Sequence, residues 1–288
     1  MRFFKPACQG WSRMPTSVYM TDVEDDYDQS VTEQEQQTGT AFCRFTDQDT
    51  ARAMAETLTF SLNDSIHPLC EIAVAELQQH LALQSEWKHN FGLDNNGDGA
   101  VIGKMFGVLV VRTRHGILGY LSAFSGKLAN GNHHNRFVEP IFDGLKTGSF
   151  LNAGMIRLSE INNEIAALSQ EDAILHQPAI TQLKELRKAH SITLQRRLLE
   201  QYNFINKAGH FKNMVDIFTT HGYKQPPAGA GECAGPKLLQ YAFRHQMEPL
   251  ALVEFWWGLS PKSATWKHGA YYKPCKEKCA PILDYMLS

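Results

Sequence analysis

The chain has 288 residues, of which 43% are hydrophobic and 20% are charged, a composition typical of a folded globular protein. It contains no apolar run long enough to cross a membrane and no N-terminal apolar stretch like that of a signal peptide, so we expect no membrane partner and a cytoplasmic location. Its six cysteines lack a dense, regular spacing, which favours thiols or metal ligands over a disulfide framework.

The net charge of −2 hides a strong asymmetry along the chain. Residues 1–100 carry 6 Lys and Arg against 16 Asp and Glu, a net charge of −10. Residues 101–180 carry 7 against 6, and residues 181–288 carry 15 against 8, a net charge of +7. A basic C-terminal third predicts contact with a polyanion, although solvated helix faces give the same pattern.

The N-terminal third changes from irregular to helical along its length. Residues 1–55 lack a hydrophobic period, and the acidic, Gln-rich stretch at 22–37 predicts a weakly structured segment. Residues 67–84 repeat apolar side chains at helical spacing and predict an amphipathic helix. The sequence DNNGDG at 94–99 matches the start of a calcium loop, but Met105 replaces the bidentate glutamate, so a simple turn explains it as well.

A β-hairpin and two long helices are expected in the middle of the chain. The segments 105–111 and 117–124 are rich in β-branched and aromatic residues and are joined by a short turn. Helical periodicity follows at 155–168 and 179–205, with Pro178 at the break. The second helix carries basic residues that could contact a phosphate backbone or could simply face solvent. They are Arg187, Lys188, Arg196 and Arg197.

Three cysteines surround one predicted strand near the C-terminus. A proline near the start of an apolar 3.6-residue period predicts a helix that begins close to Cys233, and the apolar run 250–257 suits a buried strand. Cys275 and Cys279 form a CxxxC pair just before a last predicted helix at 280–287. Thiols at helix N-termini have lowered pKa values and could hold one metal ion, with zinc expected. The alternative is three small buried core residues.

Between this strand and the last helix, aromatic residues alternate with lysines. Bases stack on aromatic rings and phosphates pair with lysines, so the segment predicts a surface for single-stranded nucleic acid. The alternative is that the aromatic residues belong to the core and the lysines are merely solvated. The predicted contact residues are Trp256, Trp257, Lys262, Trp266 and Lys267.

Together these elements predict an α+β protein. We expect a mixed sheet with packed helices, with α/β/α layers as one form of it, and a protruding helical hairpin. The expected organisation is a weakly structured acidic segment at 1–55, a body built from 56–150 and 225–288, and a hairpin insertion at 151–224.

Several long motifs are spread over residues 60–288. They include HPLCEIAVAELQQHL from residue 67, GECAGPKLLQYAF from 231, EFWWGLSPKS from 254 and KPCKEKCAPILDYML from 273. In these motifs the chain resembles the N-terminal accessory region of long bacterial RluA-type pseudouridine synthases. The resemblance implies RNA binding and substrate positioning for the isomerisation of uridine to pseudouridine in a structured RNA, ribosomal or transfer.

The catalytic motif of that family is missing from this sequence. The family carries its essential aspartate in an HRLD-type motif, and no RLD tripeptide occurs here. The resemblance therefore implies no catalytic residue in this chain. It implies a synthase catalytic domain as partner, either after Ser288 or in another chain, and no pseudouridine formation by this chain alone.

A second resemblance concerns the order of elements. A hairpin, a helix that opens with a cysteine, a strand and a helix that opens with Pro-Cys are similar to zinc-dependent nucleoside deaminases, in which a glutamate two residues after the first ligand moves protons. This implies Cys233, Cys275 and Cys279 as ligands, but Gly235 stands at the glutamate position and Glu232 precedes the cysteine. This resemblance implies a first alternative, a deaminase-like domain that is either active with Glu232 or degenerate. A separate alternative is a protein-interaction module that uses the helical hairpin.

Overall fold

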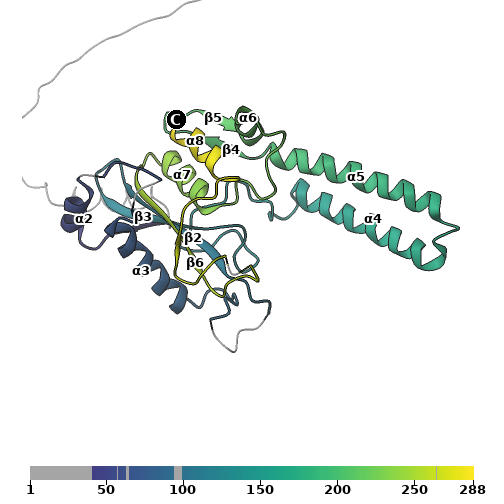
Figure 1. The fold of residues 1–288 in the computed structure, drawn as a ribbon, viewed down its shortest axis with the longest axis horizontal. Coiled ribbons are helices and arrows are strands. Elements are labelled where there is room, and N and C mark those ends of the chain that lie inside the picture. The colour runs from purple at the N-terminus through teal and green to yellow at the C-terminus, as the bar shows by residue number, and fades with distance from the viewer. Residues whose placement is uncertain (1–40, 57, 63–64, 94–98, 264) are drawn as a thin grey trace, which may run out of the picture. The chain divides into compact units, whose positions relative to one another are not determined.

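The computed structural model describes residues 41–56, 58–62, 65–93, 99–263 and 265–288, all of them in the compact unit Thr40–Ser288. The acidic stretch at 22–37 and positions 94–98 of the DNNGDG motif lie outside the described residues. Within this unit a five-stranded sheet is covered by helices on both faces (Figure 1). None of the described helices is both long enough and apolar enough to cross a membrane.

The sheet has the strand order β1-β3-β2-β6-β7. Its strands are β1 (Phe42–Arg44), β2 (Lys104–Arg112), β3 (Leu118–Phe124), β6 (Glu248–Trp257) and β7 (Tyr271–Tyr272). All neighbouring strands pair antiparallel, which corrects the mixed sheet expected from the sequence. The strand order explains this difference. β6 runs parallel to β3, but β2 lies between these two strands and pairs antiparallel with each of them. The predicted hairpin and the predicted strand are confirmed as β2, β3 and β6.

Each face of the sheet has its own hydrophobic core because side chains alternate along a strand. Val108 and Phe255 point into the core under α2 and α3, whereas Leu109 and Leu121 point into the core under α6, α7 and α8. The bounds are α2 (Gln48–Ala55), α3 (Pro68–Leu83), α6 (Met214–Thr220), α7 (Ala234–Arg244) and α8 (Ala280–Leu287). The α+β class and the α/β/α layers are therefore confirmed, as is the last helix.

The first turn of α7 lies unusually close to the sheet. Gly107 of β2 permits this approach, since a Cβ there would stand 2.8 Å from the Cβ of Ala234 and 3.1 Å from Cδ1 of Leu238. Ala234, Leu238 and Leu239 are fully buried against the strands. Cys233, the N-cap of α7, is thereby held in a defined position above the sheet.

The helices α4 (Phe150–Asp172) and α5 (Gln177–Leu199) form the predicted hairpin, which extends away from the sheet (Figure 1). The Ser149 side chain caps α4 by accepting a hydrogen bond from the backbone of the first turn. Gly154 lets Leu194 pack directly against α4 at the base of the hairpin. Both helices are 23 residues long, so each spans about 35 Å.

The second helix of the hairpin ends earlier than the sequence predicts. The chain instead forms a small two-stranded sheet from β4 (Asn203–Ile205) and β5 (Phe211–Asn213). The Asn213 amide donates to the carbonyls of Leu199 and Tyr202 and so satisfies the end of α5. This small sheet and α6 pack beside α8, in the helical layer that also contains α7.

Replacing Gly107 by alanine should lower the free energy of unfolding by roughly 1–3 kcal/mol, because the new methyl group forces α7 away from β2. Gly235→Ala is the matched control on the same interface. Its Cβ would meet its nearest neighbour at 3.5 Å, an ordinary contact distance. We expect its stability to change by no more than about 0.5 kcal/mol. Urea unfolding measures both variants; equal stabilities would contradict the close approach.

Candidate metal centre

Three cysteines from two helix N-termini meet at one place. Cys233 is the N-cap of α7, Cys279 is the N-cap of α8, and Cys275 lies one turn before Cys279. The three Sγ atoms all lie within 4.8 Å of one another, and those of Cys275 and Cys279 are 3.3 Å apart. In a tetrahedral site with metal–sulfur bonds of about 2.3 Å, sulfur atoms stand about 3.8 Å apart. The predicted ligands are therefore placed to hold a metal ion with little movement.

A local turn positions the CxxxC pair. The backbone N–H groups of Cys279 and Ala280 donate to the Cys275 carbonyl at 3.2 and 3.1 Å, which folds the chain back just ahead of α8. Backbone N–H groups of Lys278 and Cys279 also stabilise the Cys275 thiolate. The start of the helix therefore supplies donors and positive potential to a sulfur ligand.

The thiols of the centre share their protons unequally. A hydrogen bond from Cys233 lowers the pKa of the Cys275 thiol to about 2, and a hydrogen bond from Cys279 contributes less to the same shift. Hydrogen bonding to Cys275 raises the pKa of Cys233 to about 12, and hydrogen bonding to Cys233 raises the pKa of Cys279 well above its usual range. Metal binding must release whatever protons the three thiols still hold, because the thiolate is the ligand.

A buried carboxylate from β6 lies beside the centre. Glu254 is 4% exposed, and its Oε1 accepts a hydrogen bond from the Gly235 N–H at 2.9 Å. A Cβ at Gly235 would stand 3.5 Å from this oxygen, so the carboxylate lies against the first turn of α7. Burial raises the pKa of Glu254 to about 7. The sequence analysis did not predict a role for Glu254, although a single acidic residue inside the apolar run LALVEFWW indicates a buried carboxylate.

Glu232, the proton carrier implied by the deaminase resemblance, is engaged elsewhere. One of its oxygens accepts a hydrogen bond from the Tyr202 hydroxyl, and the other lies 3.5 Å from Nζ of the buried Lys237. The same Nζ donates to the carbonyls of Phe124 and Gly126 at 3.1 and 3.2 Å. Burial lowers the pKa of Lys237 in spite of this ion pair. Glu232 therefore anchors the loop before α7 to the end of β3.

The predicted phosphate contacts on α5 are all exposed, but they do not form one face. Successive residues of an α-helix turn by about 100°, so Arg187 and Arg196 point to opposite sides. Arg197 points away from Lys188 in the same way. A compact cationic group remains at Lys184, Arg187 and Lys188, which lie within about one turn of each other.

Two of these cations have partners at the base of the hairpin. Arg196 pairs with Glu200 at 3.6 Å, and the Arg197 guanidinium lies over the Phe150 ring, 4.5 Å from its centroid. Such contacts reduce the charge that a ligand meets at these positions. The outer part of α5 is therefore the better candidate for contact with phosphates.

The predicted base-stacking residues divide between two faces of the sheet. Trp256 and Trp266 are half-buried and stack on each other, with ring centroids 5.9 Å apart and an interplanar angle of 17°. Trp257 instead packs against the core shared with α3. The loop that carries Trp266 also exposes Lys262 and Lys267. The stacked pair Trp256–Trp266 therefore lies beside a loop with two exposed lysines, whereas the Trp257 side chain packs on the other face of the sheet.

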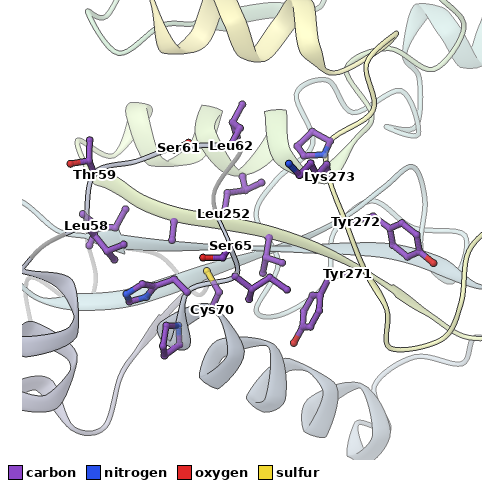
Figure 2. A pocket seen from close by; sticks show the side chains of 17 residues that line it. Leu58, Thr59, Ser61, Leu62, Ser65, Cys70, Leu252, Tyr271, Tyr272 and Lys273 are labelled. Atoms are coloured by element: carbon purple, nitrogen blue, oxygen red, sulfur yellow. The ribbon is translucent and has the colours of Figure 1, made fainter.

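Two cavities lie near these elements. The larger, of about 580 Å³, is at the edge of β6, and Figure 2 shows Leu58 and Thr59 on one side of it and Tyr271 on the other. Neither the three cysteines of the centre nor Glu254 lines this cavity. The second, of about 410 Å³, is lined by Glu232 and by the loop 226–230, so it lies beside the residue that precedes the first metal ligand.

Comparison of the chain with protein-family models, curated proteins and solved structures gave no match. The resemblance to pseudouridine synthases therefore rests on sequence motifs, and the resemblance to nucleoside deaminases rests on the order of the elements. Function has to be argued from the site itself.

The protein should take up about one divalent metal ion per chain and release protons at pH 7, because cysteine thiols must deprotonate to act as ligands. Elemental analysis measures the metal, and a pH indicator measures the protons. Cys233→Ser should lose the metal. Cys43→Ser, a half-buried thiol on β1, is the matched control and should keep it. A Cys233→Ser variant that retains the metal would contradict the centre.

Proposed function

We propose that the chain is a zinc-stabilised RNA-binding module that positions a structured RNA, ribosomal or transfer, for an RluA-type pseudouridine synthase domain. The observation that carries the proposal is the stacked, half-exposed pair Trp256–Trp266 in a loop with exposed lysines. Stacked rings beside cations bind single-stranded segments, because every base has an aromatic face and every nucleotide a phosphate. The sequence motifs supply the link to pseudouridine formation.

Zinc is the metal that this ligand set favours. Three thiolates are soft ligands that suit a tetrahedral ion without redox chemistry. The ligands come from both sides of β6 in the sequence, so one ion would join α7 to the start of α8. The segment 258–274, which carries Trp266, would then be held at one end by β6 and at the other by Cys275. The metal would therefore stabilise the RNA-binding loop as well as the helices.

The helical hairpin adds a second surface for RNA. Lys184 and Lys188 are exposed on α5 and have no ion pair with a described residue. Each helix of the hairpin spans about 35 Å, which allows contact with phosphates remote from the tryptophan pair. Phosphate contacts of this kind add affinity and orientation rather than sequence specificity.

The double variant Lys184→Gln/Lys188→Gln should bind RNA more weakly and with less salt dependence, because two phosphate contacts are lost. The slope of log K against log salt should fall in magnitude by roughly 1.4 for a single-stranded RNA. Fluorescence anisotropy at several KCl concentrations measures this slope. Arg157→Gln is the matched control, since Glu160 and Glu164 lie 2.9 and 3.6 Å from that guanidinium and already balance its charge. An unchanged slope in the double variant would remove the hairpin from the RNA interface.

Trp266→Leu should weaken RNA binding by roughly 1–3 kcal/mol, because one stacking surface is lost. Trp257→Leu is the comparison: it should lower the unfolding temperature, since Trp257 packs on the core, while the folded protein keeps its RNA affinity. Anisotropy and thermal unfolding separate the two effects. If Trp266→Leu binds RNA as tightly as the unmodified protein, the tryptophan pair is not the stacking platform.

A further inference from the structure

The turn between α4 and α5 exposes two large aliphatic side chains at the end of the hairpin that is remote from the sheet (Figure 1). Ile174 is 90% exposed, the highest value among the large hydrophobic residues in the described ranges, and Leu175 is 71% exposed. The Asp172 carboxylate accepts hydrogen bonds from both of their backbone N–H groups at 3.0 Å and so fixes the turn. Adjacent apolar side chains on a fixed, exposed turn are typical of a contact surface for another molecule.

The charge of this turn indicates which kind of molecule it contacts. Glu171 and Asp172 directly precede the aliphatic pair, and residues 170–178 contain no Lys or Arg. Two carboxylates repel phosphates, so the turn does not continue the RNA surface proposed for Lys184 and Lys188. The complementary surface is an apolar one that carries a free cation.

The base of the same hairpin has such a surface. An open hollow of about 460 Å³ runs along the N-terminal half of α4, where the Met155 and Ile156 side chains are exposed. Lys127 lines the hollow and forms no ion pair within the described part of the chain. The acid that lines it, Glu160, is already paired with Arg157 at 2.9 Å. The apolar lining consists of Leu145, Leu151, Met155 and Ile156.

We propose that two copies of this chain pair through α4, antiparallel and related by a two-fold axis, with the turn of each hairpin seated in the hollow of the other. A second copy fits because the turn and the hollow lie at opposite ends of one helix. About 20 residues, and hence about 30 Å, separate them. A two-fold axis at the middle of α4 therefore brings each turn onto the hollow of the other copy, and both contacts form at once. The pairing requires neither metal nor RNA.

The exposed face of α4 suits this arrangement along its whole length. Gly154 contacts α5, and Ile161, two turns later on the same side, is buried. Asn163 lies about 200° further round the helix than Ile161, on the side away from α5. Exposed residues on that side follow one another in steps of four and three, the spacing of a helix–helix contact, and none is charged. This α4 seam consists of Asn152, Ile156, Ser159, Asn163, Ala166 and Gln170.

The position of the seam sets the register of the pair. Asn163 lies at its middle, so a two-fold axis there places residues that are equally far before and after Asn163 opposite each other. Ile174 then comes over Asn152, and Leu175 comes over Leu151, both of which line the hollow. The register that aligns the two seams therefore also seats the aliphatic turn.

The charges at the edges of the pair are compatible with it. Glu160 and Glu164 lie beside the seam, and Arg157 of the same chain balances them at 2.9 and 3.6 Å. The two acids of each turn approach the end of the other hairpin, where Lys127 is free to pair with them. Because the second copy packs on α4 on the side away from α5, the basic residues of α5 stay accessible to RNA.

Sedimentation equilibrium of the unmodified chain should show a dimer, and a monomer at every soluble concentration overturns the proposal. Ala166→Arg places a charge in the α4 seam and should raise the dimer dissociation constant at least about tenfold. Ala189→Arg is the matched control, the same change at an exposed position of α5, and should leave the constant unchanged. Arginine is a good helix former, so both variants should fold. A dimer that tolerates Ala166→Arg overturns the proposed face.

Ile174→Ser/Leu175→Ser tests the seating of the turn. Both side chains are exposed in one copy, so the change should leave the unfolding temperature of the monomer as it is and raise the dimer dissociation constant at least about tenfold. An unchanged constant overturns the contact between turn and hollow.

Asn163→Cys tests the register, because the two copies of residue 163 meet at the axis. Mild oxidation should give a disulfide-linked dimer, in which mass spectrometry identifies a peptide pair joined at position 163. Ala189→Cys is the matched control and should give no dimer linked at position 189. A missing link at 163, or a link at 189, overturns the two-fold arrangement.

Discussion

The close contact between the first turn of α7 and the sheet is the constraint on which the centre depends. Gly107 makes this contact possible, and a backbone hydrogen bond from Gly235 adds to it. Gly107 removes a Cβ that would stand 2.8 Å from Ala234, so the helix can descend onto β2. The backbone N–H of Gly235, in the same turn of α7, donates to the Glu254 carboxylate at 2.9 Å. The same contact therefore positions the first thiol and the buried acid relative to each other.

The polar residues buried on α7 explain why this helix does not slide on the sheet. Lys237 is tied to the end of β3 through two carbonyls, while Gln240 donates to the Asn203 carbonyl and accepts from the Ile205 N–H at 3.0 Å each. These bonds offset the cost of burying polar groups and have directional requirements that apolar contacts lack. The helix that carries Cys233 is thus fixed by β3, β4 and β6 together.

The parts of this structure that were predictable have local signals, and the parts that were not depend on distant segments. The helix at 280–287 and the hairpin of β2 and β3 follow from periodicity and turn residues. The meeting of the cysteines could be inferred because each lies at a predicted helix start. In contrast, α5 ends where Asn213 caps it from another element, and the antiparallel sheet follows from strand order. The burial of Glu254 could not be predicted from its own strand, because its hydrogen-bond donor, the Gly235 N–H, belongs to a different element.

β6 links the two parts of the proposed function, metal binding and RNA binding. It carries Glu254 toward the centre and Trp256 toward the stacking pair, and its C-terminal loop returns to Cys275. Metal binding at that cysteine would restrict the loop that holds Trp266, so metal and RNA would each bind a more ordered protein in the presence of the other. Linkage requires this effect to be reciprocal. If the proposed metal site and base-binding surface are both built on this strand, they would therefore be energetically coupled.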